Sequence, residues 1–259
     1  MGKREVINKT KEYMRGRLGK EAIGHDWWHA FRVWKTAKYI AGKEGGDLFT
    51  PHRRNILTIK SGRNGKLMRN EKHQMSKKSA RDAGFIIELA ALLHDIADWK
   101  FNKGDDNIGP KLAKEWFEKM QVDEKIISHV CGIIKEMSFK GAKVKTQMRT
   151  KEGRIVQDAD RLDALGAIGI ARVFATGGRL QKRPIYDQEI SLKKLKKDLR
   201  RGDSYSSIHH FYDKTLFLKN LMNTKTGKKL AGERHEFLEK YLKQFFKEWN
   251  LKGQLHQDK

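Results

Sequence analysis

Apolar residues recur at intervals of three and four positions along much of the chain, the spacing that places one face of an α-helix in a core. The clearest stretch covers residues 86–101 and contains no Gly or Pro. The pattern predicts a central helix over about residues 82–99, in which His94 and Asp95 interrupt an apolar face. Because a buried charge costs several kcal/mol unless it is paired or bound to a metal, these two side chains require a partner from another part of the chain.

The same spacing predicts further helices on both sides of the central one. Asp26 precedes one of them and suits the N-cap, where a carboxylate accepts a backbone N–H of the first turn. Strand-like alternation is rare and Pro number only three, so the fold class we expect is all-α in one domain over residues 1–259. The predicted helices outside the centre cover residues 3–20, 27–41, 110–120, 122–137, 155–174, 208–225 and 228–251, the last two forming additional C-terminal helices (208–251) packed on the core.

Residues 50–81 have a different character from the rest of the chain. They contain ten Lys or Arg and a single acid, Glu71, with few apolar residues and scattered Gly, Asn and Ser. A connection of this length without periodicity is unusual inside a compact domain. We interpret residues 50–81 as a flexible basic insertion between two core helices.

The composition narrows the classes of protein that remain. Lys and Arg number 56 against 32 Asp and Glu, a formal net charge of +24, which attracts anions such as nucleotides, nucleic acid or acidic membrane surfaces. The single Cys131 excludes an intramolecular disulfide and favours a reducing compartment. No apolar run is long enough to span a membrane, and the first residues lack the apolar segment of a secretory signal. We therefore expect a soluble, cytoplasmic protein without a membrane partner.

Four side chains from three predicted helices stand out as possible metal ligands: His29, His94, Asp95 and Asp160. Imidazole nitrogens together with carboxylate oxygens suit one divalent ion such as Mn, Fe, Co, Ni or Zn, or Mg with more water. Two adjacent residues can both bind one ion only near a helix end or a bend. Such a mixed set leaves coordination positions open for water and a phosphate oxygen.

The motifs around these residues resemble the HD-domain metal-dependent phosphohydrolase superfamily. Its H…HD…D signature is matched by His29, by His94-Asp95 and by Asp160 within Ala-Asp-Arg-Leu. Longer stretches are similar to one branch, the small bacterial HD hydrolases that include a nucleoside triphosphate pyrophosphohydrolase; they are residues 25–33, 91–101, 137–139, 157–167, 210–214 and 231–235. The resemblance covers most of the chain except residues 50–81, which we expect relatives to lack.

The resemblance implies an HD-type helical bundle in which His29, His94, Asp95 and Asp160 hold the metal. It also implies that Asp98, one turn after Asp95, orients the attacking water or the leaving group. The nearest cations in sequence are then expected to neutralise a polyphosphate, and Arg side chains suit a bidentate grip. These substrate-binding candidates are Arg32, Lys100 and Arg161.

Several of these residues also fit plainer interpretations. Asp158 competes with Asp160 for the last ligand position; the Ala-Asp-x-Leu register favours Asp160, with Asp158 in a supporting role. Asp98 is also compatible with a surface acid, and Arg32 and Lys100 with solvated charges. His25, just before the second helix, fits a supporting role better than ligation.

The function we expect is metal-dependent hydrolysis of nucleotides, specifically (d)NTP pyrophosphohydrolysis, with nucleotide monophosphatase activity as the nearest alternative. The rival class is a nucleic-acid-binding protein or a phosphodiesterase that uses the basic surface and residues 50–81. That segment lacks interleaved aromatic residues and matches no binding module, so it predicts only salt-sensitive, non-specific phosphate contact. Nothing in the sequence indicates an oligomeric state.

Overall fold

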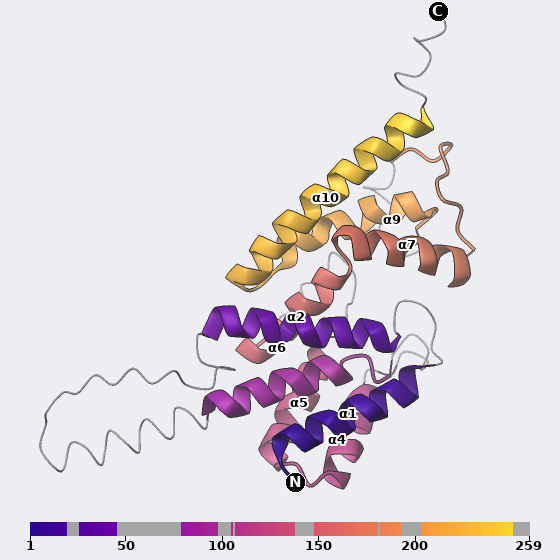
Figure 1. The fold of residues 1–259 in the computed structure, drawn as a ribbon. Coiled ribbons are helices and arrows are strands. Elements are labelled where there is room, and N and C mark those ends of the chain that lie inside the picture. The colour runs from indigo at the N-terminus through magenta and orange to yellow at the C-terminus, as the bar shows by residue number, and fades with distance from the viewer. Residues whose placement is uncertain are drawn as a thin grey trace, which may run out of the picture. The chain divides into compact units, whose positions relative to one another are not determined.

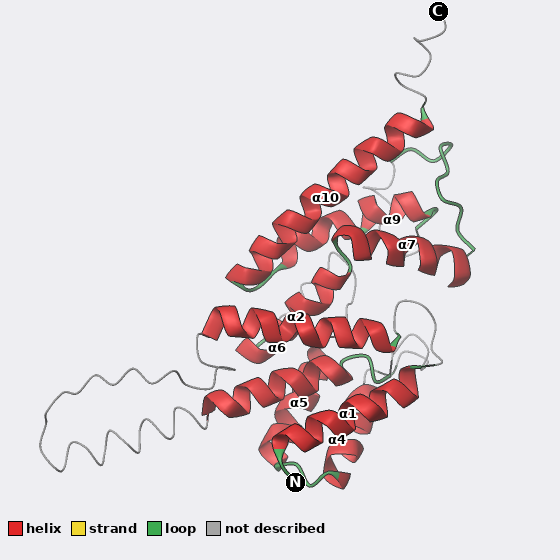
Figure 2. Cartoon of the chain, viewed as in Figure 1, coloured by secondary structure: helices red, strands yellow, loops and turns green. Residues whose placement is uncertain are grey.

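The computed structural model describes residues 1–19, 26–45, 79–97, 105, 107–137, 148–180, 182–192 and 204–250. All regular structure in these ranges is helical and none of it is a strand (Figure 2), which confirms the all-α class. Each helix in the described ranges is also too short or too polar to cross a bilayer. The described residues form two compact units, one ending at Ala159 and the other beginning at Asp160.

Unit 1 contains the helices that precede the unit border (Figure 1). Its core is apolar, and each helix contributes fully buried side chains to it, such as Val33, Leu92 and Phe117. Side-chain hydrogen bonds join the helices: Trp34 Nε1 donates to Glu88 Oε2 at 2.8 Å. The helices are α1 (Lys3–Leu18), α2 (Trp27–Gly45), a helix at 79–93, α4 (Ile108–Lys119), α5 (Glu124–Met137) and most of α6 (Lys151–Asp163).

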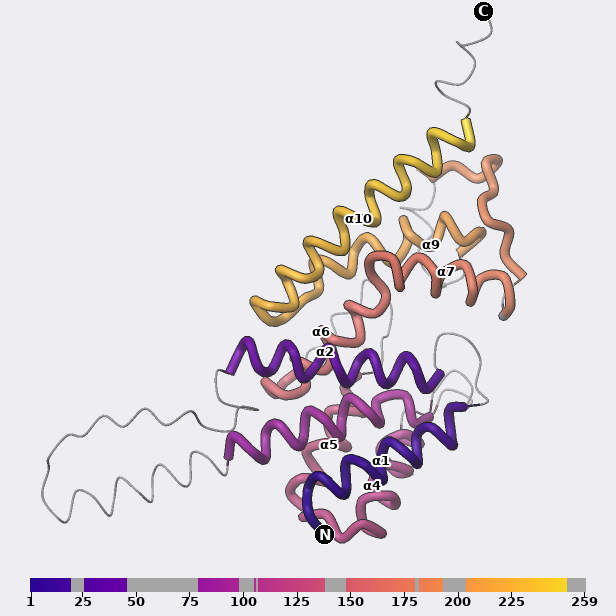
Figure 3. The backbone as a smooth tube through the Cα atoms, in the orientation of Figure 1, coloured from indigo at the N-terminus to yellow at the C-terminus, as the bar shows by residue number. Residues whose placement is uncertain are grey.

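Unit 2 contains the end of α6 and the helices that follow it, namely α7 (Gly166–Leu180), α9 (Ser207–Asp213), the 3-10 helix η2 (Thr215–Leu221) and α10 (Lys225–Trp249). The long α10 packs on α7 and η2, and α7 packs on α9 (Figure 3). Thr224 caps α10, because its Oγ1 accepts the backbone N–H of Gly227 at 2.9 Å.

Two of the predicted helices are wrong in their extent, one that crosses the border between the units and one in unit 2. The stretch 155–174 is not one helix: α6 ends at Asp163 and α7 begins at Gly166, whose φ of +68° is a conformation that glycine adopts without strain. The end of this stretch also lies beyond the predicted residue 174, because α7 runs through Gly177 and Gly178 to Leu180. The predicted helix over 208–225 is replaced by α9 and η2, because Lys214 leaves the helical region with φ −135° and ψ −59°.

The border of the basic insertion also differs from the prediction. Residues 79–81, assigned to the insertion from the sequence, form the first turn of the helix at 79–93. Residues 46–78 lie outside the described residues. The assignment of one HD-type domain to residues 1–259 stays a prediction, as does the packing of residues 208–251 on the core.

Candidate metal centre

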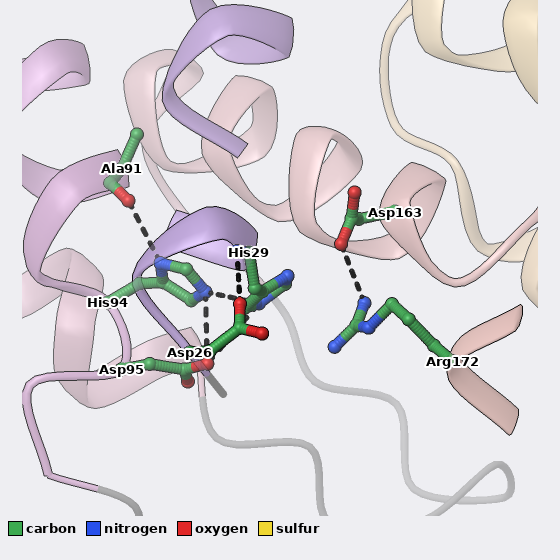
Figure 4. A network of polar contacts seen from close by, with 7 residues as sticks. All are labelled: Asp26, His29, Ala91, His94, Asp95, Asp163 and Arg172. Atoms are coloured by element: carbon green, nitrogen blue, oxygen red, sulfur yellow. Dashed lines mark hydrogen bonds and ion pairs between the residues drawn. The ribbon is translucent and has the colours of Figure 1, made fainter. Parts of the chain in front are cut away.

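The first turn of α2 places His29. Asp26 precedes this helix, and its Oδ1 accepts the backbone N–H of His29 at 2.8 Å (Figure 4). The N-cap predicted from the sequence is therefore confirmed. Because the cap bonds the third residue of the helix, it fixes the backbone of the residue whose imidazole is the predicted ligand.

A turn after the central helix places His94 and Asp95. The helix ends at residue 93, six residues before the predicted end, and the backbone N–H of Ile96 donates to the carbonyl oxygen of Leu93 at 3.0 Å. Arg17 of α1 holds the turn, since its Nε donates to the carbonyl oxygen of Ile96 at 3.0 Å. The early end of the helix lets two consecutive side chains face the same point, as expected for adjacent ligands near a helix end or bend.

Three potential ligand atoms gather in unit 1. The Nε2 atoms of His29 and His94 lie 3.1 Å apart, and Oδ2 of Asp95 lies 3.3 Å from the first and 3.4 Å from the second (Figure 4). Both imidazoles are buried, His29 at 1% exposure and His94 at 7%. We call these three side chains the donor triangle.

The hydrogen bond at the far side of the His94 ring sets its tautomer. Nδ1 lies 2.9 Å from the carbonyl oxygen of Ala91, an acceptor, so Nδ1 carries the hydrogen and donates it. In the neutral ring, Nε2 then presents a lone pair to the donor triangle. This is the arrangement of a metal-binding histidine, whose other ring nitrogen commonly donates to a backbone carbonyl.

The spacing of the donor triangle fits a divalent cation. Two ligand atoms, each about 2.1 Å from one ion, lie about 3.0 Å apart at an octahedral angle and about 3.4 Å apart at a tetrahedral one. The three observed distances, 3.1, 3.3 and 3.4 Å, fall in this range. Two imidazoles with a carboxylate match the ligand preference of borderline divalent ions.

Asp160 is the remaining predicted ligand. It follows Ala159, the last residue of unit 1, within the unbroken helix α6. Ligand atoms of His29, His94 and Asp160 all lie within 4.8 Å of one another, and this grouping includes neither Asp95 nor Asp158. Asp158 is fully buried in the same helix.

Only some of the predicted catalytic and substrate-binding residues lie in the part of the chain that the structure describes. Asp98 and Lys100 lie outside the described residues. Arg32 follows His29 by about one turn of α2 and is partly buried. Arg161 donates from Nη1 to the carbonyl oxygen of Leu221 at the end of η2, so one edge of its guanidinium has a protein partner. The roles of these four residues stay predictions.

Sequence reasoning missed a group of charged side chains at the end of α6. Arg172 of α7 donates from Nη1 to Oδ2 of Asp163 at 2.9 Å, and Arg234 of α10 donates from Nη1 to the carbonyl oxygen of Leu162. Burial lowers the pKa of the Arg234 guanidinium, and the charge of Asp163 opposes this shift. These contacts join residues nine and 72 positions apart, so no local pattern in the sequence indicates them.

Comparison with known proteins shows the family to which the chain belongs. The HD domain model matches residues 27–165, which are 139 of the 259 residues and include His29, His94, Asp95 and Asp160. The YpgQ protein of Bacillus subtilis strain 168 is 32% identical over 243 residues, 93% of this chain and 92% of that protein.

Two solved structures extend this similarity. An HD-superfamily hydrolase from Bacillus thuringiensis is 38% identical, with a TM-score of 0.64 over 96% of this chain and 99% of that one. Bacillus subtilis YpgQ in complex with ADP is 29% identical, with a TM-score of 0.65 over 96% and 97% of the two chains. The potential metal ligands all lie inside the matched region, and this chain belongs to the HD-domain superfamily of hydrolases.

Proposed function

We propose that the protein is a metal-dependent phosphohydrolase acting on nucleotides, and specifically a (d)NTP pyrophosphohydrolase. The donor triangle carries this proposal, because two buried imidazole nitrogens and a partly exposed carboxylate oxygen with the spacing of a coordination shell have a direct chemical use in phosphoryl transfer. The ADP bound to the related YpgQ structure supports a nucleotide as the substrate class.

In this proposal His29, His94, Asp95 and Asp160 hold one divalent ion. The ion, when bound, polarises a phosphoryl oxygen and lowers the pKa of a water molecule. The Ala91 carbonyl keeps a hydrogen of His94 on Nδ1, so that in the neutral ring the lone pair of Nε2 is the one available to the ion. The same donor set accepts Mn, Mg, Co, Ni, Fe or Zn, and we select Mn as the probe.

The remaining predicted residues would manage the proton and the phosphate charge. Asp98 accepts a proton from the attacking water as its oxygen bonds to the α-phosphorus, and the bond from that phosphorus to the bridging oxygen of the β-phosphate breaks. The products are a nucleoside monophosphate and pyrophosphate. Arg32, Lys100 and Arg161 offset the negative charge that the leaving pyrophosphate gains.

The test is incubation of the purified chain and Mn²⁺ with NTPs, dNTPs and nucleoside monophosphates in separate reactions, with separate detection of pyrophosphate and orthophosphate. Pyrophosphate without orthophosphate supports the proposal, and orthophosphate from monophosphates supports the monophosphatase alternative. His94→Ala removes one donor and should lower the rate at least about 100-fold. His129→Ala, which changes a histidine of α5 outside the donor triangle, should retain the activity. Failure to hydrolyse any of these nucleotides refutes the proposal.

The net charge of +24 favours a second candidate, non-specific binding or cleavage of nucleic acid. Deletion of residues 50–78 removes nine of the ten insertion cations and stops before the helix at 79–93. Loss of salt-sensitive polynucleotide binding, with nucleotide hydrolysis intact, would assign binding to the insertion. Hydrolysis of a polynucleotide that disappears with this deletion would instead favour the phosphodiesterase.

A further inference from the structure

The last turn of α6, residues 160–163, is held by polar contacts from two other helices of unit 2. Asp163 ends α6 and is buried, and its Oδ2 accepts from Arg172 Nη1 of α7 at 2.9 Å (Figure 4). Arg234 of α10 donates to the carbonyl oxygen of Leu162. We call Asp163, Arg172 and Arg234 the α6 anchor.

Each contact of the α6 anchor has a physical reason to be strong. The side chains of Arg172 and Asp163 are 20% and 6% exposed, and a charge-assisted hydrogen bond is roughly twice as strong as a neutral one. The Leu162 carbonyl is among the last four of α6; it accepts the backbone N–H of Leu165 at 3.1 Å and has a second lone pair for Arg234, and the partial negative charge of a helix C-terminus attracts a cation.

The junction between α6 and α7 makes room for this contact. Gly166 has a φ of +68°, and a Cβ added there would lie 3.2 Å from both Cβ and Cγ of Arg234. The Arg234 side chain therefore lies against a position that carries no side chain. A larger residue at position 166 would push Arg234 away and strain the backbone as well.

We propose that the α6 anchor positions the carboxylate of Asp160 for metal binding, an inference that rests on the proposed function. Asp160 lies three residues before Asp163 and thus in the same helical turn. A rotation or displacement of this turn moves the Asp160 carboxylate with it. The anchor residues are positioning residues, because they act on the ion only through Asp160.

The experiment compares variants of the full chain by their affinity for Mn²⁺ and by their melting temperature without metal. Free Mn²⁺ is measured by electron paramagnetic resonance during titration, and melting is followed by circular dichroism in EDTA. Asp163→Asn keeps the shape and removes the charge opposite Arg172. Arg172→Lys is a milder change that keeps the charge and loses the planar guanidinium. Asp213→Asn removes a carboxylate charge from another part of unit 2, where Asp213 lies at the end of α9.

The expected result for Asp163→Asn is a Kd for Mn²⁺ about 10- to 100-fold higher, the usual effect of removing a group that orients a metal ligand. Arg172→Lys should raise it at least about threefold, and Asp213→Asn by less than about twofold. A purely structural role would lower the melting temperature and leave the Kd unchanged, which overturns the inference. Equal weakening by Asp213→Asn overturns it too. A wild-type chain that binds no Mn²⁺ overturns the proposed function together with this inference.

Discussion

Removing the carboxylate of Asp26 should weaken both the fold and the proposed metal centre, because the N–H that it accepts belongs to His29. Replacement of an N-cap Asp by Ala costs about 1 kcal/mol, within a range of about 0.5–2 kcal/mol. The loss of a negative charge at a helix N-terminus adds about 0.3–1 kcal/mol. Asp26→Ala should therefore lower the free energy of unfolding by about 1–2 kcal/mol and the melting temperature by about 2–8 °C.

The effect on metal binding follows from the same hydrogen bond. If the first turn of α2 frays without its cap, binding of Mn²⁺ must order that turn again, and a penalty of about 1 kcal/mol raises the Kd about fivefold. Asp26→Asn keeps an oxygen acceptor and should retain most of the affinity. The matched control is Thr224→Ala, which removes the cap of α10 in unit 2.

The assay is Mn²⁺ titration of the three variants beside thermal unfolding in EDTA. We expect Thr224→Ala to lose stability like Asp26→Ala and to keep the wild-type Kd. An Asp26→Ala variant that melts earlier and binds Mn²⁺ as tightly as the wild type would refute the link between the cap and the ligand. Equal weakening of Mn²⁺ binding by both alanine variants would refute it as well.

Three further predictions follow from the structure. Mn²⁺ at 100 times its Kd should raise the free energy of unfolding by about 2.7 kcal/mol and the melting temperature by about 5–10 °C, and EDTA should reverse both changes; calorimetry without such a shift contradicts a metal centre. Burial raises the pKa of Cys131 to about 11, so at pH 8 only about 0.1% of the thiol is ionised. The rate of Cys131 alkylation should therefore rise about tenfold per pH unit up to about pH 11. An alkylation rate that is already constant above about pH 9 would contradict a buried thiol. Gly166→Ala should lower the free energy of unfolding by about 1–2 kcal/mol, whereas Gly178→Ala, in a helix with no atom near the added Cβ, should be neutral or stabilising in denaturant titrations.

Much of the fold could be predicted from the sequence because its local signals agree. The three- and four-residue spacing located α2 and α5, and Asp26 marked the start of α2 correctly. The H…HD…D motif then predicted His29 and His94 as metal ligands, and the Nε2 atoms of these two residues lie close together in the structure.

Other features could not be predicted because the local sequence pattern indicates a different structure or carries no information about them. The apolar spacing continues through Ile96 and Ala97, so the end of the central helix at residue 93 is invisible to periodicity. The turn that follows is held by Arg17, which lies 79 residues before Ile96 in the chain. The contact between Arg234 and Leu162 likewise depends on tertiary packing, which single-residue propensities do not encode.

The two imidazoles of the donor triangle are 65 residues apart in the chain, yet their nitrogens lie 3.1 Å apart. The entropy cost of closing so long a loop must be met before the contact contributes any favourable free energy. Contacts between residues far apart in the chain therefore usually form late in folding. Binding of an ion by both rings would therefore report that these two distant segments are already in contact. In a stopped-flow refolding experiment, the rate of Mn²⁺ uptake would therefore measure how fast the two segments come together during folding of unit 1.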